Sequence, residues 1–303
     1  MRSGITALGP IVAVTSCLVG CSAPQPSPAQ RIDLSHPESL QITGAVNNWA
    51  ALVDRAARSD IVILGEQHDD AIGHAVQLAL IEAVLGRQDN GAVALEMLER
   101  DEQILVTDYR DGVLDADDFA KATGSQRWAG VGSWTAWYQP VIDSAISHGA
   151  EVIAANAPRR YVRLVRTDGF SALDALDADR RNLVVVPNPP LDGHYRQRFV
   201  DLMGDHSDVP DPDIIDAFFR AQSTWDATMA DSVVQALQRG RRPVFLLVGR
   251  FHSDHSGGTV QCIHQGMGDQ DIDLLCISLE PEAVAEHTDG LPTQADVIVH
   301  TDP

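Results

Sequence analysis

Short apolar runs alternate with longer amphipathic stretches along most of the chain. Consecutive rather than alternating apolar positions predict strands that are buried on both faces, as in parallel sheets. Five runs have this character: Ile61–Leu64, Ala92–Leu95, Val152–Ala155, Val244–Val248 and Leu274–Ser278. Between the first two, apolar residues recur every three or four positions, which predicts a crossover helix. The pattern predicts an α/β fold with a mostly parallel sheet and helices on both faces.

Two connections are too long to be simple crossovers. Residues 99–150 end in a predicted helix from Trp134 to His148, and residues 158–242 contain a longer one from Asp213 to about Arg239. One face of the longer helix carries Ile215, Phe218, Gln222, Trp225, Met229 and Val233. We interpret residues 158–242 as a helical insertion, a lid subdomain over one edge of the sheet.

The first twenty residues have the profile of a cleavable signal peptide: one early charge, Arg2, and then a mostly apolar run. This run is shorter than the ~20 apolar residues of a membrane-spanning helix, and Pro10 interrupts it. It ends in Leu-Val-Gly-Cys, which places Cys21 where a bacterial lipobox has its acylated cysteine. We therefore expect Cys21 to carry lipid.

Residues 21–40 are rich in Pro and Ser and are expected to form a flexible tether. The folded domain then occupies residues 41–303. Ser22, rather than an aspartate, follows the cysteine and favours the outer membrane of a Gram-negative bacterium, with the domain facing the periplasm or the cell surface.

The formal charge is −21, and it becomes −22 when residues 1–20, with Arg2 and no acid, are removed. Such an acidic body repels nucleic acid and anionic lipid, so lipid chains would supply the membrane affinity. Cys262 and Cys276 remain besides Cys21. They either form a disulfide, as cysteines do in an oxidising compartment, or are two buried thiols.

Polar residues follow four of the five predicted strands. Glu66 and His68 follow the first, Glu96 the second, Asn156 and Arg159 the third, and His252 the fourth. Two of these ends share the pattern Gly-x-x-His. The carboxyl ends of parallel strands lie at one edge of the sheet, so we expect these side chains to meet there.

Glu66, His68, Glu96 and His252 combine imidazole with carboxylate, the ligand set of divalent Zn, Mn and Fe and equally an acid and base pair. Structural roles are the alternative: histidines bonded to backbone carbonyls, and glutamates paired with Arg159 or Arg250. We expect His74 to be solvated on its helix, and Gln222 and Asp226 to reach toward the same edge.

Six motifs are spread over nearly the whole of the folded domain: Ile63–Asp69, Leu95–Arg100, Ala154–Arg159, Pro190–Arg196, Ala221–Ala230 and Leu247–His252. In this order they resemble the motifs of the ChaN-like family of haem-binding lipoproteins, in the superfamily of Tiki-type proteins and erythromycin esterases. The resemblance implies a parallel sheet with a helical lid, and ferric haem held by a tyrosine near a dimer interface. The partners it implies are a second copy of the chain and an outer-membrane haem or siderophore receptor.

The resemblance does not identify the tyrosine. Tyr195, beside His194, and Tyr138 are the candidates, with a nearby histidine bonded to the phenolate. Arginines that could hold the propionates are Arg159, Arg160 and Arg196. One departure from the family is Arg250-Phe251, where a small or polar pair is expected before the second histidine.

Two functions follow from these residues. The first is a membrane-anchored haem-binding lipoprotein of haem or iron uptake, a binding protein rather than an enzyme. The alternative is a hydrolase dependent on a divalent metal ion held by Glu66, His68, Glu96 and His252. The sequence contains no Gly-x-Ser-x-Gly motif, which disfavours a serine nucleophile.

Overall fold

The computed structural model describes residues 29–204, 211–281 and 292–301. The expected signal peptide, Cys21 and the first part of the tether, residues 21–28, lie outside these residues. In the described part of the chain, no helix is both long enough and apolar enough to cross a membrane.

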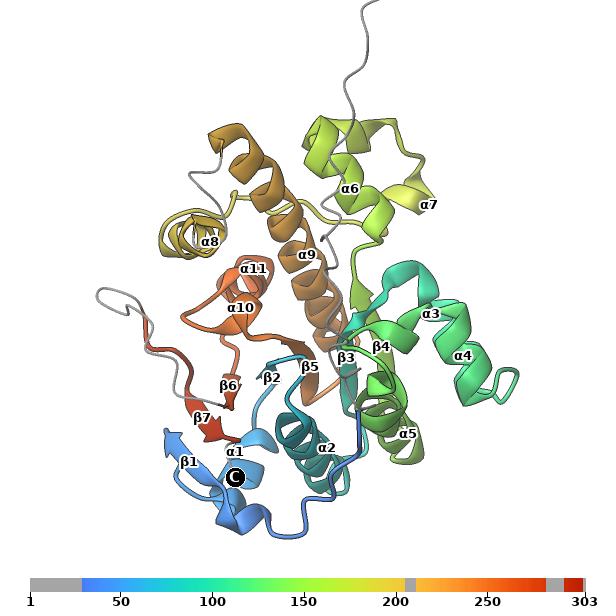
Figure 1. The fold of residues 1–303 in the computed structure, drawn as a ribbon, viewed down its shortest axis with the longest axis vertical. Coiled ribbons are helices and arrows are strands. Elements are labelled where there is room, and N and C mark those ends of the chain that lie inside the picture. The colour runs from blue at the N-terminus through green and yellow to red at the C-terminus, as the bar shows by residue number, and fades with distance from the viewer. Residues whose placement is uncertain (1–28, 205–210, 282–291, 302–303) are drawn as a thin grey trace, which may run out of the picture.

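One seven-stranded sheet, in the order β1-β7-β6-β2-β5-β3-β4, forms the centre of the molecule (Figure 1). The five expected strands are confirmed and all are parallel to their neighbours. They are β2 (Ile61–Glu66), β3 (Ala92–Glu99), β4 (Glu151–Asn156), β5 (Val244–Gly249) and β6 (Leu274–Glu280). Their side chains are almost all buried, as consecutive apolar positions require.

Two strands were not expected from the sequence. The strand β7 (Val297–His300) is parallel to β6, and β1 (Gln41–Gly44) is antiparallel to β7 at one edge. Both have four residues and are only partly buried, so they lack the long apolar run that marks the central strands. The sheet is therefore mixed, with a single antiparallel pair.

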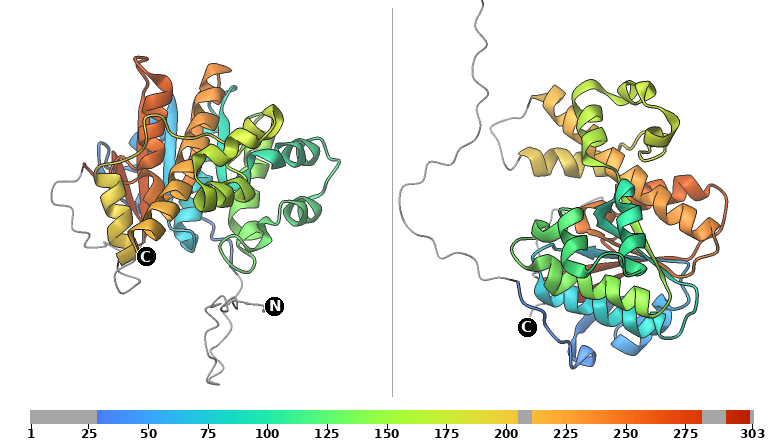
Figure 2. Two further views of the ribbon diagram at one scale, coloured as in Figure 1. Left: turned by 90° about the horizontal axis from the view of Figure 1, so that it is seen from above. Right: turned by 90° about the vertical axis from the view of Figure 1, so that its right-hand side faces the viewer.

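Helices cover both faces of the sheet, as expected (Figures 1 and 2). On one face lie α1 (Trp49–Ala56), α2 (Ala71–Leu85), a π-helical turn η4 (Trp134–Tyr138) and α5 (Gln139–Ser147), which share one hydrophobic cluster. A second cluster on the opposite face joins α8 (His194–Gly204), α9 (Pro212–Gln238) and α11 (Gly258–Met267).

Shorter elements complete the chain. They are η1 (Pro37–Ser39), η2 (Arg100–Glu102), α3 (Gln103–Arg110), α4 (Ala116–Ala122), η3 (Ser125–Arg127), α6 (Arg159–Asp168), η5 (Phe170–Ala175), α7 (Ala178–Arg181) and α10 (Arg250–Ser253).

The described residues between 158 and 242 are largely helical, but they do not only cover an edge of the sheet. Their last helix, α9, packs against β3, β4 and β5 and against α11, so it is a main covering helix of the sheet. Toward its N-terminal end α9 also contacts α6 and α8, which lie beyond the carboxyl ends of the strands (Figure 1). These three helices therefore form walls above the edge where the polar motifs end.

Candidate functional site

The two Gly-x-x-His segments and both glutamates lie at one level of the sheet, as the sequence predicts. Glu66 is opposite Gly249 in the pairing of β2 with β5. The Nε2 atom of His252 lies 3.7 Å from Oε1 of Glu96. Gly249 lies close to His68, since a Cβ atom on it would be 3.1 Å from Nε2 of that histidine. The shared edge is thus confirmed.

The carboxylate of Glu66 is buried at the centre of a first hydrogen-bonded network. Its Oε1 accepts from Tyr138 Oη at 2.7 Å and its Oε2 from Gln77 Nε2 at 2.6 Å. The Nδ1 atom of His68 lies 2.8 Å from Oε1. Burial lowers the pKa of His68, but the hydrogen bond to Glu66 and the charges of Glu96 and Glu66 outweigh it and raise the pKa to about 9. His68 is therefore a cation at neutral pH.

His74 belongs to the same network, so the expectation that it is solvated is wrong. The side chain is buried and stacks on Trp137, with ring centroids 4.5 Å apart. Its Nε2 meets the carbonyl of His68 at 3.1 Å and its Nδ1 meets Gln77 at 2.9 Å. The elements η4 and α5 pack against α2, which the helix pattern alone does not reveal.

Asp226 is the centre of a second buried network. It accepts from Nδ1 of His252 at 2.7 Å, and Thr259 and Tyr195 each donate a hydroxyl to it at 2.7 Å. Burial lowers the pKa of His252, but the charge and hydrogen bond of Asp226 outweigh it and raise that pKa. The amide of Gln222 lies 3.1 Å from the hydroxyl of Tyr195, so Gln222 and Asp226 reach the edge as expected.

The four candidate metal ligands, Glu66, His68, Glu96 and His252, share one edge of the sheet. Among the described residues, no group of three or more His, Cys, Asp or Glu side chains is arranged to hold a metal ion. Both oxygens of Glu66 accept hydrogen bonds in the first network, and Oε2 of Glu96 accepts from the backbone N–H of Gly249 at 2.7 Å. The alternative salt bridges to the glutamates are not formed either, because Arg159 pairs with Glu99 and Arg250 with Asp254.

A cavity of about 540 Å³ opens beside this edge. We call it the arginine-rimmed cavity. Its apolar walls come from Trp128, Val162, Phe199, Met203, Phe218, Ala221 and Trp225, and its polar side chains are Glu96, Asn156, Gln222, His252, Arg159, Arg163 and Arg166. Phe218 is 38% exposed because it lines this opening, although the helix pattern placed it on the buried face.

Neither expected haem-ligating tyrosine lines the cavity. Tyr138 and Tyr195 are both 0% exposed, and each donates its hydroxyl to a buried carboxylate. Burial, together with the charge of that carboxylate, raises the pKa of each phenol well above 10. A tyrosinate ligand at either position is therefore disfavoured in this conformation.

The other residues expected around the haem are also dispersed. The Nε2 atom of His194 lies 2.8 Å from the backbone carbonyl oxygen of His255. Arg160 pairs with Asp101, and Arg196 pairs with Asp216. Of the three expected arginines, only Arg159 lines the cavity.

Sequence reasoning missed two of the cavity's arginines, Arg163 and Arg166. With Arg159 they are spaced four and three residues apart on α6, so all three lie on one face of that helix. This spacing could have identified Arg163 and Arg166 from the sequence. It also explains why Arg160, one residue on, points to a different partner.

Cys262 on α11 and Cys276 on β6 are free and buried in the structure. Of the two alternatives left open by the sequence, the structure therefore has the buried thiols. Burial, followed by the charges of nearby aspartates, raises the pKa of both.

Comparison with known proteins places this site in context. Residues 52–263 match the family model described as haem-binding uptake, Tiki superfamily, ChaN. The structure of ChaN of Campylobacter jejuni with cofacial heme has a TM-score of 0.65 at 17% sequence identity, over 86% of this chain and 96% of that one. No curated protein matches.

Two further solved structures match less closely. The type III effector HopBA1 has a TM-score of 0.46 at 12% identity, over 88% of this chain and 99% of that one. A mutant of the erythromycin esterase EreC has a TM-score of 0.40 at 14% identity, over 84% of this chain and 78% of that one.

Proposed function

Because the chain belongs to the haem-binding uptake family of ChaN, in the Tiki superfamily, we propose that it binds haem and that the arginine-rimmed cavity receives the porphyrin. The observation that carries this proposal is the composition of that cavity. Aromatic and aliphatic walls suit the faces of a porphyrin, and most small-molecule sites are of this apolar kind.

The rim of the cavity suits the two propionates of haem. Arg159, Arg163 and Arg166 line one side of it from a single helix. Guanidinium groups bind carboxylates with paired, charge-assisted hydrogen bonds. The Arg159 guanidinium already lies 4.7 Å from the ring centre of Trp128, so cationic and aromatic groups are adjacent at this mouth.

We propose His252 as the iron ligand. Histidine and methionine are known axial ligands of haem, and the cavity is lined by His252 and Met203. The Nδ1 atom of His252 is bound to Asp226, so Nε2, which lies 3.3 Å from the amide nitrogen of Gln222, is the nitrogen that would bind the iron. A carboxylate behind a ligating imidazole fixes its tautomer and makes it a better donor. Haem, when bound, would supply the iron chemistry, and this chain would hold and orient it.

A hemin titration of residues 31–303, followed by absorption spectroscopy, tests the proposal. We expect a stoichiometric Soret change that His252→Ala shifts and weakens strongly. The double change Arg163→Ala and Arg166→Ala should weaken binding by about threefold to tenfold, as partly exposed ion pairs do.

Arg160→Ala is the matched control, because Arg160 is on the same helix but outside the cavity, and it should bind hemin normally. If hemin does not bind, and elemental analysis of the isolated protein finds one divalent metal ion per chain, the proposal fails and the hydrolase expected from the sequence replaces it.

We also propose that the mature chain is a lipoprotein of the outer membrane, anchored through Cys21. The support is the lipobox-like Leu-Val-Gly-Cys, followed by a Pro/Ser-rich stretch. Two lipid chains hold a protein firmly where one does not. Cys21→Ser should abolish palmitate labelling and release the protein from outer-membrane fractions. Labelling that survives the change would place the anchor elsewhere. A second copy and a receptor partner stay predictions.

A further inference from the structure

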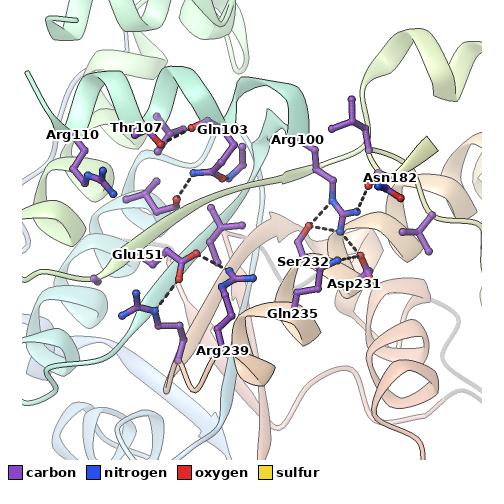
Figure 3. A pocket seen from close by; sticks show the side chains of 18 of the residues that line it. Arg100, Gln103, Thr107, Arg110, Glu151, Asn182, Asp231, Ser232, Gln235 and Arg239 are labelled. Atoms are coloured by element: carbon purple, nitrogen blue, oxygen red, sulfur yellow. Dashed lines mark hydrogen bonds and ion pairs between the residues drawn. The ribbon is translucent and has the colours of Figure 1, made fainter. Parts of the chain in front are cut away.

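The strand β4, at one edge of the sheet, borders a groove of about 1310 Å³ (Figure 3). Helix α3 and the C-terminal part of α9 form its sides, and residues 181–185 form its far wall. We call it the β4 groove. In the described part of the chain it has no lining residue in common with the arginine-rimmed cavity, so the function proposed above does not account for it.

Half of the backbone groups of β4 face into this groove. The strand pairs with β3 on one side only, and the N–H of Glu151 donates toward that side, to Gly91. Residues along a strand alternate in the direction of their hydrogen bonds, so Val152 and Ala154 point the other way. These outward groups can pair with a further strand.

The side chain of Gln103 shows that an amide fits this edge (Figure 3). Its Nε2 donates to the carbonyl of Val152 at 3.0 Å, and its Oε1 accepts from the N–H of Ala154 at 2.8 Å. One residue of a parallel neighbouring strand would make the same two bonds, one to each side of Ile153. The side-chain amide of Gln103 thus takes the place of the N–H and C=O of one strand residue. Its position marks the register of an added parallel strand.

The charge of the β4 groove indicates what such a strand would carry. Five arginines line it against two acids, Glu151 and Asp231, a difference of +3 in a chain whose formal charge is −21. The five are Arg100, Arg110, Arg181, Arg239 and Arg241.

Three of these arginines are matched by acids inside the groove. Arg100 pairs with Asp231, while Arg239 and Arg241 share Glu151. Arg110 pairs only with Asp111, which does not line the groove, and Arg181 donates to a backbone carbonyl. Arg110 and Arg181 are therefore the cations that an acidic ligand can meet.

We propose that the β4 groove binds an extended, acidic segment of a partner protein, which adds to the sheet as a parallel strand beside β4. Its backbone takes over the two hydrogen bonds of Gln103, and its carboxylates pair with Arg110 and Arg181. Strand addition of this kind draws its affinity from the main chain and its specificity from alternate side chains. A small anion would pair with the arginines but would form no hydrogen bonds with the backbone edge of β4.

A peptide that alternates Val and Glu over about eight residues, within the usual length of a strand, is the probe. Its binding to the purified full chain is measured by fluorescence anisotropy. Two matched peptides distinguish the contribution of backbone hydrogen bonds from that of charge. One is the same sequence N-methylated at alternate residues, and the other has Lys in place of Glu. We expect the N-methylated peptide to bind at least about tenfold more weakly, because it lacks the ladder donors, and the Lys peptide not to bind.

Variants of the chain complete the test. Gln103→Ala should bind the Val/Glu peptide about tenfold more tightly, because the peptide no longer displaces an amide that makes two hydrogen bonds. The double change Arg110→Gln and Arg181→Gln should weaken binding, and Arg58→Gln, an exposed arginine outside the groove, should not.

Equal affinity for the N-methylated peptide would overturn strand addition and leave an anion site. No binding by either the wild-type chain or Gln103→Ala would overturn the proposal entirely. Hemin binding, which depends on other residues, is expected to stay unchanged in all of these variants.

Discussion

The Nδ1 atom of His252 lies 2.7 Å from Oδ1 of Asp226 inside the protein. A carboxylate can only accept, so Nδ1 carries a proton and donates it. Nε2 is the atom left toward the arginine-rimmed cavity, and it lies 3.3 Å from the amide nitrogen of Gln222 and 3.7 Å from Oε1 of Glu96. One buried carboxylate therefore determines which nitrogen of the imidazole a ligand can reach.

Changing Asp226 to Asn tests this relationship. The amide removes the charge that orients His252, and loss of such an outer partner usually costs about 10–100-fold in metal affinity. We expect hemin affinity to fall in that range, measured by titration at equal folded fraction from circular dichroism. Thr259→Val removes a different hydrogen bond to the same carboxylate and serves as the control, with a much smaller effect. Unchanged hemin affinity in Asp226→Asn would contradict His252 as the ligand.

The two buried phenols give a second prediction. Tyr138→Phe and Tyr195→Phe each remove a hydroxyl that donates to a buried carboxylate, Glu66 or Asp226. A hydrogen bond to a charged group is worth about 1.5–3 kcal/mol, so each change should lower the free energy of unfolding by that amount in urea denaturation. Hemin binding should persist. Loss of the ferric charge-transfer band in one variant alone would restore the tyrosine ligand that the family resemblance implies.

Thiol labelling gives a third prediction. Burial raises the pKa of Cys262 and Cys276, and the thiolate is the reactive form. Native residues 31–303 should resist a maleimide, whereas the unfolded chain should take up two labels without any reductant, as counted by mass spectrometry. Labels that appear only after reduction would show that a disulfide forms in the protein.

The central strands were predictable because consecutive apolar positions carry a strong signal of burial on both faces. The convergence of Glu66, His68, Glu96 and His252 then follows from parallel pairing alone, since parallel strands end on one side. By contrast, β1 and β7 have only four residues each, so neither contains an apolar run as long as those of the central strands. Local pattern does not specify such pairings.

The details of the site depend on contacts between distant segments. Asp226 on α9 and Tyr195 on α8 meet beside Gly258 on α11, a glycine because any side chain there would collide with both. The sequence around Tyr195 contains no signal of that burial, so the local pattern does not reveal that this candidate ligand is packed inside the protein. His74 is misjudged for the same reason, because Trp137 covers it.

The last prediction concerns a carboxyl group near the cavity. Burial, and then the charges of Glu99 and Asp101, raise the pKa of Glu102 to about 7, although its hydrogen bond with the N–H of Glu99 opposes this. Because the folded pKa lies above the unfolded value near 4.3, the protonated form is favoured in the folded chain. The resulting stabilisation is complete below pH 4 and is lost as the pH rises through about 7.

Glu102→Gln keeps an acceptor for the N–H of Glu99 but cannot ionise. We expect it to raise the Tm of residues 31–303 at pH 8 by about 2–4 °C, the effect of ~1 kcal/mol in a domain of this size, and to leave the Tm at pH 4 nearly unchanged. Glu38→Gln is the control, since that carboxyl is exposed and its pKa is lowered rather than raised. Differential scanning calorimetry across this range gives the answer. An equal gain at both pH values would mean that Glu102 is charged in the folded chain at neutral pH, contrary to its burial between Glu99 and Asp101.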